Sequence, residues 1–210
     1  MNNMNTQLEY WDNLFSKLGL KEPSHDGWLI KHNEILQLSE NTPIVDLGCG
    51  SGHNSKFLKE NGYDVISCDF SSKALNRLQT FVPDCKPFKF NMLDGFPFDD
   101  NSFKILISDL SIQYFTVEDT FYVLSEIKRV LHDDGYFICR VNSTNDTNYG
   151  AGKGIKLSEN YYNLNGKLKR FFNREDLNKF FSDWKVEHIE ECEMNRYEKT
   201  KILWEIVAKK

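Results

Sequence analysis

The chain has 210 residues, with 31 acidic and 26 basic side chains and a formal net charge of −5. This length predicts one domain, residues 1–210, with a core large enough to fold without disulfides. A hydrophobic fraction of 40% and an aromatic fraction of 14% exclude a disordered chain. The acidic balance, without a basic block, argues against a dedicated binder of duplex nucleic acid.

The cysteines and the apolar runs give expectations about location. Five separated cysteines form no CxxC pair, which predicts reduced thiols in a cytoplasmic protein and no metal site. No apolar run approaches the roughly 18 residues of a membrane span, and the polar N-terminus does not read as a signal peptide. No membrane association is therefore expected.

The first 42 residues predict two amphipathic helices, around residues 8–18 and 28–38. They have no place in the alternating pattern that follows, so we interpret residues 1–42 as an N-terminal helical cap over the functional site.

Short apolar runs alternate with helical patterns through residues 43–141. Strands are expected at 44–47, 64–68, 86–90, 103–108 and 135–141, and helices at 54–61, 71–81 and 118–131. Such alternation is typical of a parallel α/β sheet with helices on both faces.

The pattern changes in the last part of the chain, residues 142–210. A polar, glycine-bearing segment from 143 to 154 is too long for a simple connection and predicts a lid loop. A short helix at 173–181 follows, and strands at 184–192 and 202–208 predict an antiparallel hairpin at the edge of the sheet.

A glycine-rich turn, VDLGCGSGH at residues 45–53, follows the first expected strand. Glycines there allow positive φ and let a ligand approach the backbone closely. A dinucleotide site requires G-x-G-x-x-G, whereas His53 stands at the position of that third glycine. Asp46 disfavours an adjacent pyrophosphate and favours a cationic ammonium group. A ligand with an amino-acid head is therefore favoured, and an NAD-dependent dehydrogenase is the weaker alternative.

Asp69 ends the second expected strand, where a carboxylate can accept hydrogen bonds from both hydroxyls of a ribose. His53 opens the helix after the glycine turn and is expected to face the carboxylate end of the ligand. Together these residues predict a nucleoside carrying an amino-acid group.

The segments VDLGCGSG and CDFS resemble the class I S-adenosylmethionine-dependent methyltransferases. The resemblance is firm over about residues 43–141 and looser over the last 40 residues. It implies a seven-stranded, doubly wound Rossmann-like sheet with its last strand antiparallel, S-adenosylmethionine as cofactor and S-adenosylhomocysteine as product. It also implies which residues contact each part of the cofactor. By this resemblance, Asp69 contacts the ribose and Phe70 flanks the adenine. The methionine part is then held by Asp46 and by the turn residues Gly48, Cys49, Gly50 and Gly52.

The segment FNMLDGFPFDD resembles the end of the family's third strand and the turn that follows. The position that usually holds an adenine-contacting aspartate is Asn91, with Met92 next. The resemblance therefore implies that Asn91 and Met92 contact the adenine, with Asp94 as the neighbouring alternative.

Residues around the expected methyl position are candidates for the acceptor side. Asp109 ends the fourth strand and is predicted as a cofactor contact and a catalytic residue that orients an amine or takes its proton, or else as a loop-capping acid. Tyr114 is predicted as catalytic and acceptor-binding, and Trp28 and Tyr149 as acceptor-binding aromatic residues. Arg196, with Arg140 and Lys153, is a candidate for an anionic substrate group, or else part of a solvated turn.

The sequence thus predicts a cytoplasmic methyltransferase, monomer or homodimer, that methylates an N, O or S atom of a small molecule. A transfer RNA or protein methyltransferase and a non-catalytic S-adenosylmethionine-binding module are the alternatives. No N/D-P-P-Y/F motif follows Asp109, which disfavours adenine-N6 methylation of nucleic acid.

Overall fold

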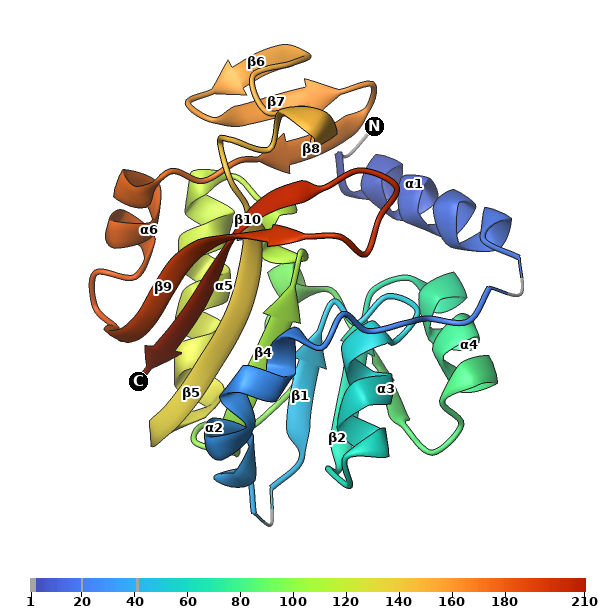
Figure 1. The fold of residues 1–210 in the computed structure, drawn as a ribbon, viewed down its shortest axis with the longest axis vertical. Coiled ribbons are helices and arrows are strands. Elements are labelled where there is room, and N and C mark those ends of the chain that lie inside the picture. Colours follow the sequence, from blue (N-terminus) through green and yellow to red (C-terminus); the bar gives the residue numbers. More distant parts are fainter. Residues whose placement is uncertain (1–2, 20, 41) are drawn as a thin grey trace.

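The computed structural model describes residues 3–19, 21–40 and 42–210. The predicted N-terminal cap includes residues 1, 2, 20 and 41, which lie outside the described residues. A seven-stranded sheet forms the centre of the molecule (Figure 1). Its strands, in spatial order, are β3 (Lys86–Lys89), β2 (Val65–Asp69), β1 (Ile44–Leu47), β4 (Phe103–Asp109), β5 (Leu131–Asn142), β10 (Lys201–Lys209) and β9 (Lys185–Met194).

The strands from β3 to β5 are mutually parallel, whereas β10 is antiparallel to both β5 and β9. This order confirms the expected seven-stranded sheet with an antiparallel last strand. The chain leaves β1 toward β2 and later returns to β4 on the other side of β1, so the connections after β1 and β4 diverge. Such a switch point opens a crevice at the carboxyl ends of the strands, which point toward the small sheet at the top of Figure 1.

Helices cover both faces of the sheet because β1 and most of β4 are buried and apolar on both sides. One core contains side chains from α5 and α6, and the other contains side chains from α2, α3 and the short helix η1. Helix α4 packs on β2 and β3. The bounds of these helices are η1 (Trp28–His32), α2 (Asn33–Gln37), α3 (His53–Glu60), α4 (Ser72–Phe81), α5 (Val117–Val130) and α6 (Arg174–Phe180).

The two predicted N-terminal helices have different places. Helix α1 (Asn3–Lys17) lies across the carboxyl ends of the strands, next to α4 and the small sheet (Figure 1). The second segment forms η1 and α2, whose Leu29 and Leu36 pack with Ile44 in the core on one face of the sheet. The expectation of a cap is therefore wrong for this segment, because its apolar side chains complete a sheet face.

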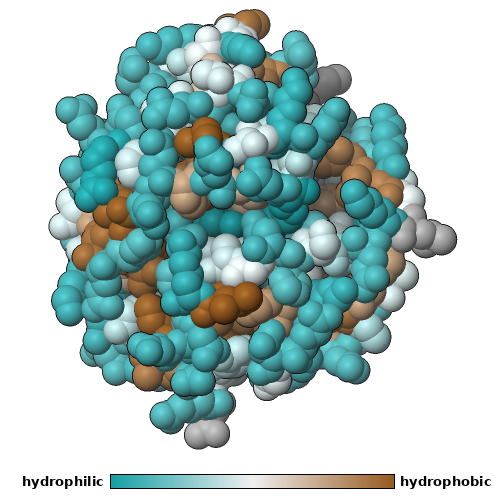
Figure 2. All heavy atoms as spheres, viewed as in Figure 1, coloured by the Kyte–Doolittle hydropathy of each residue, from teal (hydrophilic) through white to brown (hydrophobic). Residues whose placement is uncertain are grey.

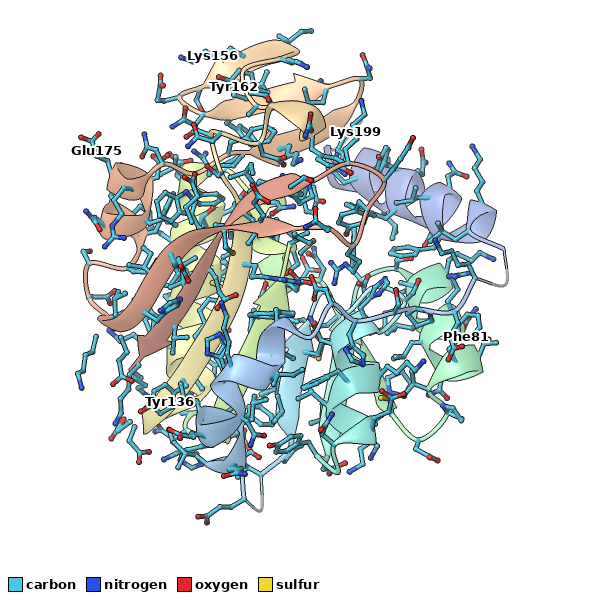
Figure 3. The ribbon with its side chains drawn as sticks, in the orientation of Figure 1. Phe81, Tyr136, Lys156, Tyr162, Glu175 and Lys199 are labelled. Atoms are coloured by element: carbon cyan, nitrogen blue, oxygen red, sulfur yellow. The ribbon has the colours of Figure 1, made fainter. Side chains whose placement is uncertain are left out.

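A second, three-stranded sheet lies in the region where the sequence predicted a lid loop. It consists of β6 (Ile155–Ser158), β7 (Tyr161–Leu164) and β8 (Lys167–Arg170), all antiparallel. Figure 3 labels Lys156 and Tyr162 on this sheet, at the end of the molecule above β10. The Asn165-Gly166 pair between β7 and β8, with both residues at positive φ, is a hairpin signal that the sequence prediction missed. Residues 143–154 form an irregular connection that contains the short helix η4 (Thr147–Tyr149).

Hydrophilic side chains cover most of the face in Figure 2, and apolar side chains gather there in separate patches. No helix in the described part of the chain has the length and apolar character needed to cross a membrane.

Candidate active site

A cavity of about 970 Å³ lies at the carboxyl ends of β1, β2 and β4. Side chains of α1, β8 and the β9–β10 loop also line it, so the cavity is enclosed by segments far apart in the sequence. Its volume is at the upper end of the range for small-molecule sites.

The glycine turn forms one wall of this cavity. Gly48 has a φ of +69°, and a Cβ there would lie 2.3 Å from the Cβ of Ser111. Gly48, Cys49 and Gly50 line the cavity. Gly52 does not: it precedes α3 at a φ of +92°, where a Cβ would lie 2.4 Å from Cδ1 of Leu78. Gly52 therefore does not make the predicted cofactor contact, and a glycine is needed there because a side chain would collide with Leu78.

Asp69 at the end of β2 faces the cavity next to this turn. Its Oδ2 accepts a hydrogen bond from the Gly50 amide at 2.9 Å, and its Oδ1 accepts one from the Ser71 amide at 2.9 Å. Burial raises the pKa of Asp69 to about 6. Each carboxylate oxygen has a further lone pair, so the side chain can hold the turn and also accept from ribose hydroxyls.

An apolar section of the cavity adjoins Asp69, as the adenine assignment requires. Phe70, Asn91 and Met92 all line it, together with Phe90 and Leu93. Asn91 Oδ1 accepts a hydrogen bond from the Leu93 amide at 3.2 Å. Asp94, the alternative to Asn91, is not among the lining residues.

Asp46 and His53 flank the turn in different ways. Asp46 is 1% exposed and does not line the cavity; its Oδ2 accepts a hydrogen bond from Ser55 Oγ at 2.6 Å. Burial raises the pKa of Asp46 to about 6. Asp46 therefore does not face the cavity as predicted. Its hydrogen bond with Ser55 instead holds α3 against β1. His53 lines the cavity and pairs through Nδ1 with the Ser24 carbonyl; its contact with the carboxylate end of the ligand stays a prediction.

Asp109 ends β4 between two guanidinium groups. Arg140 donates to it from Nε at 2.9 Å and from Nη2 at 2.8 Å, and Arg196 Nη2 lies 3.0 Å away. Burial would raise the pKa of Asp109, but the charges of Arg140 and Arg196 outweigh burial and hold it well below its usual range. This geometry disfavours the proton-accepting role and leaves Asp109 as an anchor for Arg196.

Trp28 lies on the far side of Arg140, away from the cavity. Its ring is 4.2 Å from the Arg140 guanidinium, and its Nε1 donates to Asn54 Oδ1 at 2.9 Å. Asp26 accepts from Arg140 Nη1 at 2.9 Å. The predicted acceptor contact at Trp28 is therefore wrong in position: Trp28, 7% exposed, supports the Arg140–Asp109 pair from the core.

The other three acceptor candidates line the cavity. Tyr114 accepts a hydrogen bond from Gln113 Nε2 at 3.3 Å, and burial raises its pKa, so its hydroxyl is neutral. The Tyr149 hydroxyl bonds to the backbone of Lys199, in the β9–β10 loop labelled in Figure 3. Arg196 is buried, and its Nε and Nη1 have no partner among the described residues. Of its expected companions, Arg140 is saturated by carboxylates and Lys153 is exposed outside the cavity.

Phe15 of α1 and Lys201 at the start of β10 also line the cavity, and no motif in the sequence marks them. Trp11 of α1 and Lys167 and Lys169 of β8 line it too. Lys167 and Lys169 alternate along a short strand, so their side chains lie on the same face of it. Within the described residues, no group of three histidine, cysteine or acidic side chains could hold a metal ion.

A glycine turn after β1 and an acid at the end of β2 face one cavity in a sheet of this strand order. This is the arrangement that the resemblance to class I S-adenosylmethionine-dependent methyltransferases implies. Residues 45–139 match the family described as a methyltransferase domain. Over this stretch, just under half of the chain, the protein is similar to that family.

Three comparisons illustrate the likeness. The chain is 28% identical over 104 residues to an uncharacterized methyltransferase of Synechocystis, covering 50% of this chain and 49% of that protein. It thus spans about half the length of this curated relative.

Among solved structures, a S-adenosylmethionine-dependent methyltransferase from Methanosarcina mazei has a TM-score of 0.74 at 20% identity, covering 87% of this chain and 97% of that one. The 1,6-didemethyltoxoflavin-N1-methyltransferase of Burkholderia thailandensis, solved with S-adenosylhomocysteine, has a TM-score of 0.63 at 14% identity, covering 99% and 85%. Both structures share the fold of this chain.

Proposed function

We propose that the protein transfers a methyl group from S-adenosylmethionine to an N, O or S atom of a small-molecule acceptor. The observation that carries this proposal is the single cavity, in which the glycine turn and Asp69 share one space with Tyr114, Tyr149 and Arg196. One part of the cavity suits the cofactor, and the other suits an acceptor.

The residues present fit this cofactor. The backbone of Gly48 and Gly50 forms a wall without side chains, Asp69 has free lone pairs for the ribose, and Phe70 and Met92 supply an apolar slot for the adenine. When bound, the cofactor supplies a sulfonium methyl whose C–S bond breaks as the acceptor atom forms its new bond to carbon, the sulfur keeping the electron pair and the acceptor proton passing to solvent.

The protein's own contribution is position and exclusion of water. Asp109 holds Arg196 at the boundary between the two parts of the cavity. Tyr114 is held beside this boundary by Gln113 and by the ring of Trp11, at 5.0 Å, so its neutral hydroxyl orients the acceptor. We retain Tyr114 as the catalytic candidate and assign Asp109 a positioning role.

A small acceptor is favoured because α1, β8 and the β9–β10 loop enclose the acceptor part. A transfer RNA or protein acceptor would have to reach past these segments, and the net charge of −5 does not favour a nucleic acid. We keep a cytoplasmic location and a monomeric or homodimeric state as predictions of the sequence.

The test combines cofactor binding with a search for product. Calorimetry should show binding of S-adenosylhomocysteine, and incubation with methyl-labelled S-adenosylmethionine and a metabolite extract should place label in a small molecule. Label in protein or RNA would instead support the macromolecular alternative. Binding without transfer to any fraction would support a non-catalytic module.

A further inference from the structure

Three lysines line the acceptor part of the cavity. Lys167 and Lys169 alternate along β8 and so project from the same face of that strand. Lys201 begins β10 and lies against them. Lys169 is 4% exposed and Lys201 is 5% exposed. These are unusual values for lysine, which is almost never fully buried without a partner.

The lysines have few negative partners. Lys201 Nζ lies 3.2 Å from Asp146, a buried carboxylate that also accepts from the side chain of Asn142. Lys169 Nζ donates to the Tyr149 carbonyl at 3.0 Å. Within the described residues, neither Lys167 nor Lys169 forms an ion pair. One carboxylate therefore faces three lysine amines.

Aromatic rings take the place of the missing carboxylates. Lys167 Nζ lies 4.7 Å from the ring of Trp11 and 5.0 Å from that of Tyr114. Lys201 Nζ lies 3.9 Å from the ring of Tyr149, and Lys169 Nζ lies 4.6 Å from that of Phe171. Cation–π contacts offset part of the cost of burial but do not neutralise the charge.

The protonation of the lysines reflects this excess of positive charge. Burial and the nearby charges of Lys201 and Lys167 lower the pKa of Lys169 to about 6. The charge of Asp146 raises this pKa but does not outweigh them. Burial also lowers the pKa values of Lys167 and Lys201. A bound anion would reverse these shifts, because a nearby opposite charge favours the protonated amine.

Arg196, which lines the same cavity, adds two further donors. Its Nε and Nη1 are unpartnered among the described residues, although the side chain is only 6% exposed. Buried donors without partners cost free energy until a ligand accepts from them.

We propose that the methyl acceptor carries an anionic group, a carboxylate or a phosphate, that Lys167, Lys169, Lys201 and Arg196 bind. The rings of Tyr149 and Tyr197, 5.9 Å apart beside Lys201, provide an apolar surface for the rest of the acceptor. This inference rests on the proposed function and specifies its class of substrate.

A binding experiment tests the anion site without requiring turnover. Benzoate and inorganic phosphate are titrated by calorimetry into the protein saturated with S-adenosylhomocysteine, with neutral benzamide as the comparison. We expect at least tenfold weaker binding of the anions to Lys169→Met than to the wild type. Affinity for S-adenosylhomocysteine should change less than twofold. Lys153→Met, which removes an exposed lysine outside the cavity, is the matched control and should behave as wild type.

Proton uptake gives a second readout in the same experiment. At pH 7, anion binding should draw close to one proton onto the wild type because Lys169 is mainly neutral beforehand. The binding enthalpy should therefore differ between buffers of different ionisation enthalpy, and Lys169→Met should lose this difference. Equal affinity of wild type and Lys169→Met for both anions, including absence of binding to either, overturns the proposal, as does benzamide binding as tightly as benzoate.

The identity of the acceptor separates this inference from the proposed function. The mass of the labelled product, less one methylene, gives the acceptor, which we expect to be an anion at pH 7. A neutral or cationic acceptor overturns the inference and leaves the methyltransferase function intact. Anion binding without any labelled product would overturn the function and leave the anion site established.

Discussion

Asp109 shows how the neighbours of a carboxylate decide what it can do. A general base near neutral pH needs a pKa close to the working pH, whereas Arg140 and Arg196 hold the pKa of Asp109 well below its usual range. The same two contacts make Asp109 important for position, because Arg196 Nη2 finds a carboxylate there 3.0 Å away.

Asp109→Asn should therefore destabilise the protein at neutral pH. Two buried guanidinium groups lose a charged partner, which costs about 3 kcal/mol and lowers the melting temperature by about 6–12 °C. The carboxylate's contribution is present above the unfolded-state pKa and is lost as the pH falls below about 4, so the difference from wild type should narrow there. Thermal unfolding between pH 3 and pH 8 measures this trend.

The exposed carboxylate Asp133 provides the control, since Asp133→Asn should leave the melting temperature within about 1 °C of wild type. An unchanged melting temperature for Asp109→Asn, with loss of the acid limb of the pH–rate profile, would restore the role of general base.

Asp69→Asn should weaken binding of S-adenosylhomocysteine by about tenfold to a hundredfold. The substitution keeps the shape of the side chain but removes the charge that accepts from ribose hydroxyls, a loss of about 1.5–3 kcal/mol. Calorimetry measures the affinity, and Asp84→Asn, on an exposed carboxylate after α4, is the control. Unchanged affinity in a folded Asp69→Asn protein would contradict the ribose assignment.

The positions of Gly48, Gly50 and Asp69 in the cavity wall could be predicted because they lie in two short segments at the carboxyl ends of β1 and β2. Local sequence fixes Gly48, Gly50 and Asp69 relative to each strand end, and parallel strands bring those ends together. Trp28 could not be placed in this way, since its packing on Arg140 joins residues 112 positions apart. Residue type alone does not distinguish a tryptophan facing a cavity from one behind its wall.

Helix α1 closes the cavity through side chains that contact the cofactor wall. Phe15 lies 3.3 Å from where a Cβ of Gly50 would be, and Trp11 lies against Tyr114. Asp12 Oδ1 accepts a hydrogen bond from Ser71 Oγ at 2.5 Å and so ties α1 to the N-terminus of α4. The structure therefore holds α1 beside the cavity by a few such contacts.

Asp12→Ala should speed release of S-adenosylhomocysteine. Loss of one hydrogen bond of about 1 kcal/mol makes opening of α1 about fivefold more frequent. Stopped-flow measurement of dissociation tests this expectation, and Glu9→Ala, on the exposed side of the same helix, is the control. Equal dissociation rates for Asp12→Ala and wild type would show that α1 does not limit release.

The main sheet and the small sheet differ in how far the sequence determines them. Strands β1 and β4 are nearly continuous apolar runs because helices cover both of their faces, which makes them visible in the sequence. Strands β6 and β8 are short, β8 consists mainly of basic residues, and β6 is exposed throughout. Their pairing depends on tight turns and on contacts with α1 and η3 (Ile112–Tyr114), which hydrophobic periodicity does not report.

The net charge of the chain is negative, whereas the charge of the side chains in one part of the cavity is positive. A net charge of −5 argued against a binder of duplex nucleic acid, yet Lys167, Lys169 and Lys201 gather inside one cavity. Composition sums over the chain, whereas the cost of burying a charge depends on where the fold places it. The acceptor part of the site is therefore a product of the tertiary structure.

Lys169→Met should stabilise the ligand-free protein relative to wild type by an amount that grows as the pH falls from 8 to 6. The folded state holds Lys169 with a pKa lowered to about 6, whereas the unfolded chain protonates it at its usual value. Unfolding of the wild type therefore takes up a proton in this interval. As the pH is lowered from 8 toward 6, the free energy of unfolding of the wild type decreases, and below about pH 6 this decrease levels off. The variant lacks this uptake.

The expected difference is on the order of 1–2 kcal/mol across the interval, or about 2–8 °C in melting temperature. Thermal unfolding of wild type, Lys169→Met and Lys153→Met in the same buffers measures it, and the exposed Lys153 variant should follow wild type at every pH. A pH-independent difference between Lys169→Met and wild type would mean that Lys169 stays protonated in the empty cavity. Asp146 would then be sufficient to keep the buried lysines protonated without a ligand. The argument that the acceptor carries an anionic group would be weaker.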